Sequence, residues 1–321
     1  MTELFRDLDG RPLCPDGSVV CIGAFDGLHI GHRALVARAV ARARDLGVPA
    51  VALSFEPLPR EFFAGGSPPP RLQLPRMKLR GFAALGIDRV GLLRFNAALA
   101  SLSPEEFVQR LLVARLQARE VWVGPDFRFG RARAGNLALL QRMGVELGFA
   151  AETIAPVELG GVPASSTRIR AALQSGDFAT ATRLLGQPYA IAGRVVRGKQ
   201  LGRTLGYPTA NLRFGGKTPA LRGIYATRVH GVADAPWPSV SSFGTRPTVD
   251  GKEPLLEAHL FDFDGDLYGR HIEVEFVARL RDEEKFPDLP TLVVQMDRDA
   301  EQARRLLGSP QSIQTTERAP A

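Results

Sequence analysis

The sequence contains little cysteine and no long apolar run. Cys14 and Cys21 are its only two cysteines, too few for a disulfide framework and too isolated for a zinc site. No stretch approaches the ~18 consecutive apolar residues of a membrane-spanning helix. The acidic first ten residues, MTELFRDLDG, lack the apolar core of a secretory signal. We therefore expect a protein of the reducing cytoplasm that has no association with a membrane.

Lysine is scarce, although positive charge is in excess. Lysine and arginine number 41 against 34 acidic residues, which gives a net charge of +7, and only five of the 41 are lysines. Such an excess fits a nucleic-acid partner, or an arginine-rich codon usage combined with small anionic substrates. No run of five like charges marks a nucleic-acid-binding tail, so we favour the second interpretation.

The length of 321 residues and the 45% hydrophobic content predict two globular domains rather than a disordered chain. The first half alternates between strand-like and helical patterns, which predicts a parallel sheet covered on both faces. Within it, Ser103, Pro104 and Glu106 form a helix start with a hydroxyl cap, an early proline and a capping-box glutamate. The expected strands are 18–25, 50–55, 88–93 and 120–123, and the expected helices are 33–46, 75–85, 104–116 and 136–143.

After about residue 187 the chain changes to short segments rich in Val, Ile and aromatics, separated by Gly, Pro and Asp. This pattern is typical of an antiparallel barrel or sandwich. Apolar positions near one face predict a last helix over 289–307, and the polar tail 309–321 is predicted to be disordered. The expected strands are 189–196, 223–229, 239–243, 255–261 and 272–278.

Two histidines three residues apart follow the first expected strand. His29 and His32 precede the expected helix 33–46, and Gly27 and Gly31 let the backbone approach a ligand closely. A helix N-terminus favours phosphate, and imidazoles beside it donate hydrogen bonds to phosphate oxygens as charge builds up. The alternatives are a metal-binding pair or two incidental turn histidines, and the surrounding strand, glycines and helix favour phosphate.

The longer string around these histidines, GAFDGLHIGH over residues 23–32, resembles a known family. It carries the His-x-Gly-His signature of nucleotidylyltransferases and is similar over its full length to bacterial bifunctional riboflavin kinase/FMN adenylyltransferase. The segments 54–63, 123–130 and 165–170 match the same family. The resemblance implies catalytic roles for His29 and His32, and nucleotide binding by Gly23, Phe25, Asp26 and Gly31.

The segment SSTRIR, residues 165–170, holds the ATP phosphates in that family. From the residues alone, Ser166 and Thr167 precede a short helix, so their hydroxyls either cap it or bind phosphate. Arg170 has the geometry for paired hydrogen bonds to phosphate. The resemblance therefore adds Ser166, Thr167 and Arg170 to the nucleotide-binding residues.

The loop 123–130 lies at the FMN and nucleotide site of the family. Asp126 follows a strand end, where α/β proteins bind ligands. Phe127 and Phe129 either line this site or lie in the core, which is the commoner position of an aromatic residue. One position departs from the family pattern: Leu58 stands where the family usually has the histidine of Pro-His-Pro. We expect this change to weaken one phosphate contact.

A glycine-rich, basic loop precedes a proline turn in the second half. The run GRVVRGKQLGRTLGYPTAN, residues 193–211, exposes N–H groups that suit polyphosphate, although a glycine-rich hairpin without a ligand shares this spacing. Thr209 and Asn211 are two residues apart, so in an extended segment both oxygens point the same way and suit Mg²⁺. The run closely resembles the riboflavin kinase signature, in which Pro-Thr-Ala-Asn contributes to Mg-ATP binding. The implied nucleotide-binding residues are Gly198, Lys199, Gly202, Gly206 and Pro208.

Glu257 lies in an expected strand with His259 on the same face and Leu256, Ala258 and Leu260 on the other. A solvent-facing glutamate is the plainer interpretation. By resemblance, Glu257 aligns with the catalytic glutamate of the kinase. In that role it takes the proton of the ribityl 5′-hydroxyl of riboflavin as this oxygen attacks the γ-phosphate of ATP.

These observations predict an α/β Rossmann-like nucleotidylyltransferase domain, residues 1–186, followed by an antiparallel riboflavin kinase β-barrel with a C-terminal helix, residues 187–308. The resemblance implies that ATP phosphorylates riboflavin to FMN, and that ATP then adenylylates FMN to FAD with release of pyrophosphate. The expected partners are riboflavin, FMN, FAD, ATP and Mg²⁺, without nucleic acid or membrane, and the sequence makes no prediction of oligomeric state. Two alternatives stay open: a riboflavin kinase with weak adenylyltransferase activity, and a basic nucleic-acid-binding module.

Overall fold

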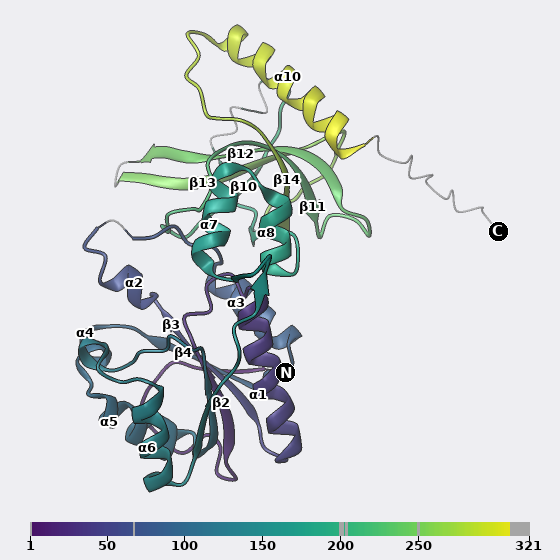
Figure 1. Cartoon of the computed structure of the whole chain (residues 1–321). Helices are drawn as coiled ribbons and strands as arrows, with labels where there is room; N and C mark the ends of the chain where they lie inside the picture. The colour runs from purple at the N-terminus through teal and green to yellow at the C-terminus, as the bar shows by residue number, and fades with distance from the viewer. Residues whose placement is uncertain (1, 67, 199–201, 203–204, 249–250, 309–321) are drawn as a thin grey trace, which may run out of the picture. The chain divides into compact units, whose positions relative to one another are not determined.

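The computed structural model describes residues 2–66, 68–198, 202, 205–248 and 251–308 (Figure 1). The predicted tail 309–321 lies outside these residues. The chain divides into two compact units. The first comprises the chain up to Arg170 and then Arg183–Gly186, and the second comprises Ala171–Thr182 and the chain from Gln187 onward.

The first unit is built on a six-stranded parallel sheet. Its strands are β1 (Glu3–Phe5), β2 (Ser18–Ile22), β3 (Ala50–Glu56), β4 (Arg89–Arg94), β5 (Ala118–Val123) and β6 (Ala150–Thr153). They lie in the order β1-β4-β3-β2-β5-β6, and every neighbouring pair is parallel, which confirms the predicted α/β sheet. The order reverses between β2 and β5. At such a reversal, α/β proteins bind ligands at the carboxyl ends of the strands.

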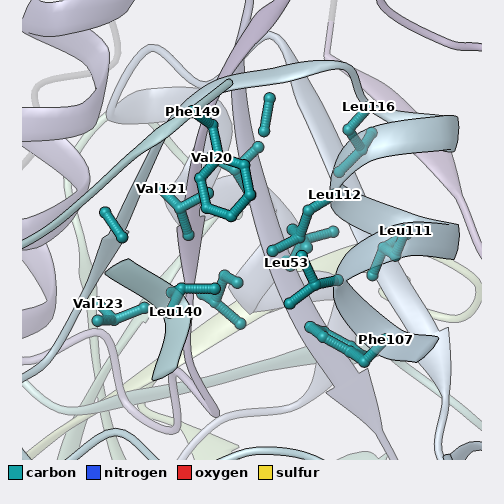
Figure 2. Close-up of a cluster of buried hydrophobic side chains, with 14 of the residues drawn as sticks. Val20, Leu53, Phe107, Leu111, Leu112, Leu116, Val121, Val123, Leu140 and Phe149 are labelled. Carbon is teal, nitrogen blue, oxygen red and sulfur yellow. The ribbon is translucent and has the colours of Figure 1, made fainter. Parts of the chain in front are cut away.

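Helices cover both faces of this sheet. The helical segments up to residue 150 are α1 (Ile30–Asp45), α2 (Pro59–Phe62), α3 (Pro75–Ala84), α4 (Ala97–Ser101), α5 (Pro104–Phe107), η1 (Val108–Arg115), η2 (Arg131–Arg133) and α6 (Leu137–Leu147). Helices α7 (Ser166–Ser175) and α8 (Phe178–Leu185) follow in the chain, and their residues are divided between the two units. Along β2, Val19 and Cys21 pack against α1 and α3, whereas Val20 and Ile22 pack against η1 and α6. Figure 2 shows the second of these clusters. This alternation buries both faces of a central parallel strand.

The helix start predicted at Ser103 is confirmed. The Ser103 hydroxyl accepts a hydrogen bond from the backbone N–H of Glu106 at 3.1 Å, and the Glu106 carboxylate accepts one from the backbone N–H of Ser103 at 2.7 Å. The helix continues from α5 directly into η1. The short elements β1, α2 and α4 were not predicted, because three to five residues are too few to show a hydrophobic period. The two-residue strands β7 (Glu158–Leu159) and β8 (Val162–Pro163) were missed for the same reason.

The second unit contains a nearly closed antiparallel barrel, as predicted. Its strands are β9 (Ala190–Arg194), β10 (Ala210–Arg213), β11 (Gly223–His230), β12 (Trp237–Thr248), β13 (Gly251–Leu260) and β14 (His271–Arg281). They lie in the order β10-β13-β12-β11-β14-β9, with antiparallel neighbours throughout. A bridge between Val196 and Asn211 links the two edges of the sheet. The strand β10 was not predicted as a separate element.

Helix α10 (Leu289–Leu307) has the predicted bounds. Asp288 caps it by accepting a hydrogen bond from the backbone N–H of Thr291 at 2.8 Å. Ala300 and Ala303 pack against Phe261 and its neighbours. Phe243, Phe261 and Phe276 are all buried, which confirms their predicted core positions. Because these rings face the core, these three residues offer no stacking platform for bases.

The segment between the sheet and the barrel packs with the barrel. Phe178, at the start of α8, lies edge-on to Tyr225 with ring centroids 5.9 Å apart and parallel to Phe276 at 6.3 Å. Residues 171–182 therefore belong structurally to the second unit. The division into functional domains at residues 186 and 187 stays a prediction.

Candidate active sites

His29 and His32 stand at the N-terminus of α1, directly beyond the carboxyl end of β2. His29 is the N-cap residue, and its Nδ1 accepts a hydrogen bond from the backbone N–H of His32 at 3.3 Å. An Nδ1 that accepts a hydrogen bond carries no proton, so the ring proton of neutral His29 is on Nε2. Gly31 permits this arrangement, because a β-carbon at this position would lie 3.2 Å from the His29 Nδ1.

The two imidazole rings stack with centroids 3.6 Å apart. Burial lowers the pKa of His29 to about 4, and burial together with the neighbouring His29 and Lys78 lowers the pKa of His32 well below its usual value. Both rings are therefore neutral near pH 7. The buried Nδ1 of His32 has no hydrogen-bond partner among the described residues. No group of three or more His, Cys, Asp or Glu residues suited to a metal occurs in that part of the chain either.

Phe25 and Asp26 are buried beneath the histidines. The Phe25 ring lies edge-on to both His32 and Phe82, with centroids 5.1 Å apart in each case. The Asp26 carboxylate accepts hydrogen bonds from the backbone N–H groups of Leu72 and Gln73 at 3.2 Å. Both side chains are thus engaged inside the protein. Their predicted contact with nucleotide, like that of Gly23, stays a prediction.

The segment 165–170 lies beside this loop. The Arg170 guanidinium pairs with Asp26 at 2.5 Å, and the Ser166 hydroxyl donates a hydrogen bond to the carbonyl of Asp26 at 2.8 Å. Of the two alternatives for Ser166 and Thr167, capping is wrong, because α7 begins at Ser166 and Ser165 takes the capping position, accepting from the backbone N–H of Arg168 at 3.3 Å. Thr167 is exposed. Two motifs more than 130 residues apart in the sequence therefore meet in the structure.

A cavity of about 730 Å³ opens beside the loop that follows β5. Phe127 and Phe129 line it, with their rings stacked 5.4 Å apart. Phe129 is also buried, so it serves both as a core residue and as a wall. Asp126 is exposed and does not line this cavity. The other walls were not predicted as site residues and are mostly aromatic or arginine residues: Phe55, Arg60, Phe63, Phe95, Phe107, Arg128, Arg131 and Arg133.

In the barrel unit, Asn211 lies directly opposite Glu257 in the pairing of β10 with β13. The Asn211 Nδ2 donates a hydrogen bond to the Thr209 carbonyl at 3.1 Å, whereas its Oδ1 is buried without a hydrogen-bond partner in the described chain. Gly198 lies close by, because a β-carbon there would be 2.8 Å from that Oδ1. The Nδ1 of His259 lies 2.9 Å from the Pro208 carbonyl and fixes the turn before Thr209.

A second cavity, of about 450 Å³, adjoins these residues. It is lined by Thr209 and Asn211, and by a loop carrying Asp264, Asp266 and Tyr268, over whose ring the Arg197 guanidinium lies at 5.4 Å. Among the predicted nucleotide-binding residues, Pro208 also lines it. Gly202 approaches the Tyr207 carbonyl too closely for a β-carbon, and Gly206 has a positive φ. Lys199 lies outside the described residues.

Glu257 is half-buried, and the predicted alternation along β13 is confirmed because Leu256, Ala258 and Leu260 are buried. A second carboxylate, Glu283, was not predicted as a site residue. Burial raises the pKa of Glu283, and the negative charge of Glu257 adds to this rise, while Arg222 opposes it. The candidate base therefore has an acidic neighbour.

Both units match families of known enzymes. The FAD synthetase family model matches residues 12–168, and the riboflavin kinase family model matches residues 185–307. Fold and sequence together define an α/β adenylyltransferase unit followed by a riboflavin kinase barrel.

Curated relatives match both units at once. The bifunctional riboflavin kinase/FMN adenylyltransferase of Escherichia coli (strain K12) is 44% identical over 307 residues, covering 95% of this chain and 98% of that protein. That of Pseudomonas fluorescens is 46% identical over 292 residues, covering 90% and 93%. The chain therefore belongs to the family of bifunctional riboflavin kinase/FMN adenylyltransferases.

A solved structure also matches nearly the whole chain. It is a Streptococcus pneumoniae protein described as a macrolide-efflux protein, 31% identical, with a TM-score of 0.74 over 94% of this chain and 98% of that one. No helix in the part of the present chain that the structure describes has the length and apolarity to cross a bilayer.

The protein is thus a transferase with two activities on small molecules. It phosphorylates riboflavin with ATP to give FMN, and it transfers AMP from ATP to FMN to give FAD and pyrophosphate.

Proposed function

We propose that adenylyl transfer takes place in the first unit, where the order of the strands reverses between β2 and β5. The proposal is supported chiefly by the neutral histidine pair at the N-terminus of α1, beside the first turns of α7, which carry Ser166 and Arg170. ATP places its phosphates over this helix end, where backbone N–H groups and the helix dipole favour negative charge. The flavin of FMN occupies the aromatic cavity, and the arginines around it suit the phosphate of FMN.

In this reaction, a phosphate oxygen of FMN attacks the α-phosphorus of ATP, and the bond from that phosphorus to pyrophosphate breaks. Negative charge grows on the departing pyrophosphate. His29 meets it with the N–H of Nε2, the tautomer that its Nδ1 contact enforces. Because both rings are neutral, they donate hydrogen bonds to the pyrophosphate, and the protein does not have to stabilise a buried positive charge before the substrates bind.

We further propose that the barrel phosphorylates riboflavin at the face shared by Thr209, Asn211 and Glu257. Glu257 takes the proton of the ribityl 5′-hydroxyl as that oxygen attacks the γ-phosphorus, and the bond to ADP breaks. Mg²⁺ fits this face, because the buried Oδ1 of Asn211 has no hydrogen-bond partner among the described residues and Mg²⁺ prefers oxygen ligands. When bound, the metal neutralises phosphate charge.

A two-product assay tests this proposal. Purified protein is given riboflavin and Mg-ATP, and FMN and FAD are quantified by chromatography with mass detection. We expect both products, with FMN appearing first. FMN without FAD would instead support a kinase with a weak adenylyltransferase, as the departure at Leu58 allows. A salt-dependent shift with an oligonucleotide, without one from flavin and ATP, would support the nucleic-acid alternative.

We also place the protein in the cytoplasm. The proposal is supported by Cys14 and Cys21, which are both buried free thiols and suit a reducing compartment. Fractionation of cells that express the protein, followed by riboflavin kinase assays of each fraction, checks it.

A further inference from the structure

Two buried cations in the first unit take no part in the reaction described above. Arg71 is 1% exposed and precedes α3, and Lys78 is 0% exposed and lies on α3. Burying a charge is costly unless hydrogen bonds and opposite charges compensate it. The groups that bind these two cations belong to the segments that form the proposed ATP site and the proposed FMN site.

Lys78 holds the loop between β2 and α1. Its Nζ donates hydrogen bonds to the carbonyl of Ala24 at 2.7 Å and to the hydroxyl of Ser54 at 3.0 Å. The Ser54 hydroxyl in turn donates to the same carbonyl at 3.1 Å. Directly after Ala24 the backbone takes positive φ angles at Phe25 and Leu28, which are costly for residues other than glycine. The ammonium group therefore anchors the loop that ends at His29.

Arg71 holds the wall of the aromatic cavity. Its guanidinium donates two hydrogen bonds to Glu56, at 2.9 and 3.1 Å, and pairs with both carboxylate oxygens of Glu61. Glu61 belongs to α2, whose other residues include Arg60, and Phe63 follows this helix. Arg60 and Phe63 both line the cavity, so the ion pair fixes the segment that carries them.

One short stretch of backbone joins these two anchors. The N–H groups of Leu72 and Gln73, next to Arg71, bind the Asp26 carboxylate, which also pairs with Arg170. We infer that Arg71 and Lys78 are positioning residues for adenylyl transfer: Lys78 sets the nucleotide loop and Arg71 sets the flavin wall. The inference rests on the proposed function of this unit.

The test uses full-length Lys78→Met and Arg71→Met proteins. FAD formation from supplied FMN gives kcat and the KM for FMN, and FMN formation from riboflavin on the same preparation reports on the other unit. For Lys78→Met we expect kcat to fall by roughly 10–100-fold with little change in the KM for FMN, because a displaced loop misplaces the reacting groups. For Arg71→Met we expect mainly a rise in the KM for FMN, of roughly tenfold.

A pH profile separates positioning by charge from simple packing. Burial and the nearby Arg71 lower the pKa of Lys78 to about 8, while Asp26, Glu56 and Glu61 oppose the shift. His32, which also faces Lys78, is neutral across this range. Above pH 8 Lys78 loses its charge, so kcat of the unaltered enzyme should decline. The Lys78→Met protein should lack this alkaline decline, and an identical decline in both proteins would overturn the role of Lys78.

Milder variants guard against loss of folding. Ser54→Ala removes one partner of Lys78 but keeps the Ala24 carbonyl, and should lower kcat alone by about threefold. Glu61→Gln keeps the shape of Glu61 but removes its charge, and should raise the KM for FMN alone. If both variants leave both parameters unchanged, the inference is wrong. If the unaltered protein makes no FAD from supplied FMN, it is the proposed function that fails.

Discussion

The two units hold their predicted site residues in different ways. In the α/β unit the key side chains are buried and tied to other protein groups, as Asp26 is by Arg170 and by two backbone N–H groups. In the barrel they lie on paired strands beside an open cavity, and the Oδ1 of Asn211 has no hydrogen-bond partner among the described residues. The first site is therefore set by tertiary packing, and the second by strand register. Substitutions of site residues should therefore lower both stability and activity in the first unit, whereas in the second unit they should lower activity with little change in stability.

The largest effect should come from the barrel. Replacing Glu257 with Gln keeps the shape and removes the base, so riboflavin kinase turnover should fall by about 10²–10⁴ with little change in riboflavin affinity. FAD formation from supplied FMN should be unchanged, because it belongs to the other unit. Both rates and riboflavin binding are measured on one preparation.

Glu273→Gln is the matched control, since Glu273 is also half-buried on a barrel strand but lies opposite Ala192 and His230 rather than opposite Asn211. Its kinase turnover should be normal. Near-normal turnover of the Glu257→Gln protein would remove this residue from the mechanism.

The next effect should come from the histidine pair. Replacing His32 with Ala removes one hydrogen-bond donor to the departing pyrophosphate, so FAD formation should fall by about 10²–10³. FMN formation from riboflavin should continue, and both products are quantified over time. Equal loss of both activities in a folded protein would contradict the assignment of the reactions to separate sites.

A smaller effect should appear in the metal requirement of the kinase. Asn211→Ala removes the buried Oδ1, so the Mg²⁺ concentration for half-maximal kinase rate should rise by about 10–100-fold. The Mg²⁺ dependence of FAD formation should stay as it is in the unaltered protein. Titration of Mg²⁺ at fixed ATP in both assays checks this, and a parallel shift in both would count against a separate kinase metal site.

The smallest effect should come from the cavity wall. Phe63→Ala removes an aromatic contact, so the KM for FMN in adenylyl transfer should rise by about 2–12-fold while riboflavin phosphorylation keeps its KM. Val145→Ala is the control, because Val145 is an exposed hydrophobic residue of the same unit that does not line the cavity. If both substitutions change the KM for FMN equally, the cavity is not the binding site of the flavin of FMN.

Much of the fold could be predicted from local patterns. The alternation of strands and helices, the change to short strands and the bounds of α10 all rest on periodicities that a single segment carries. The strand β10 was missed because its four residues follow directly on a motif rich in turn residues. The capping error has a similar origin: Ser165, Ser166 and Thr167 are consecutive hydroxyl residues, and only the backbone shows which one starts the helix.

The candidate sites were predictable only where a motif is continuous in sequence. His29, His32 and Arg170 belong to such motifs, and the structure brings them to one place. Lys78 was missed because a basic residue in a helical pattern looks like a surface charge, and Arg71 because it follows three prolines outside any periodic segment. The burial of both depends on groups that are distant in the sequence. Phe63 and Glu283 were missed for the same reason, since their roles depend on which segments fold beside them.

The pairing of β13 limits how this gene can change in length. Glu257 lies opposite Asn211 on one side and Ser242 on the other. Because the side-chain period of a strand is two, inserting or deleting one residue ahead of Glu257 would turn it inward and leave Leu256 or Ala258 facing Asn211. Such a change would remove the base while nearly every codon stayed the same. Substitutions in this region should therefore be tolerated more readily than a one-residue insertion or deletion within β13 ahead of Glu257.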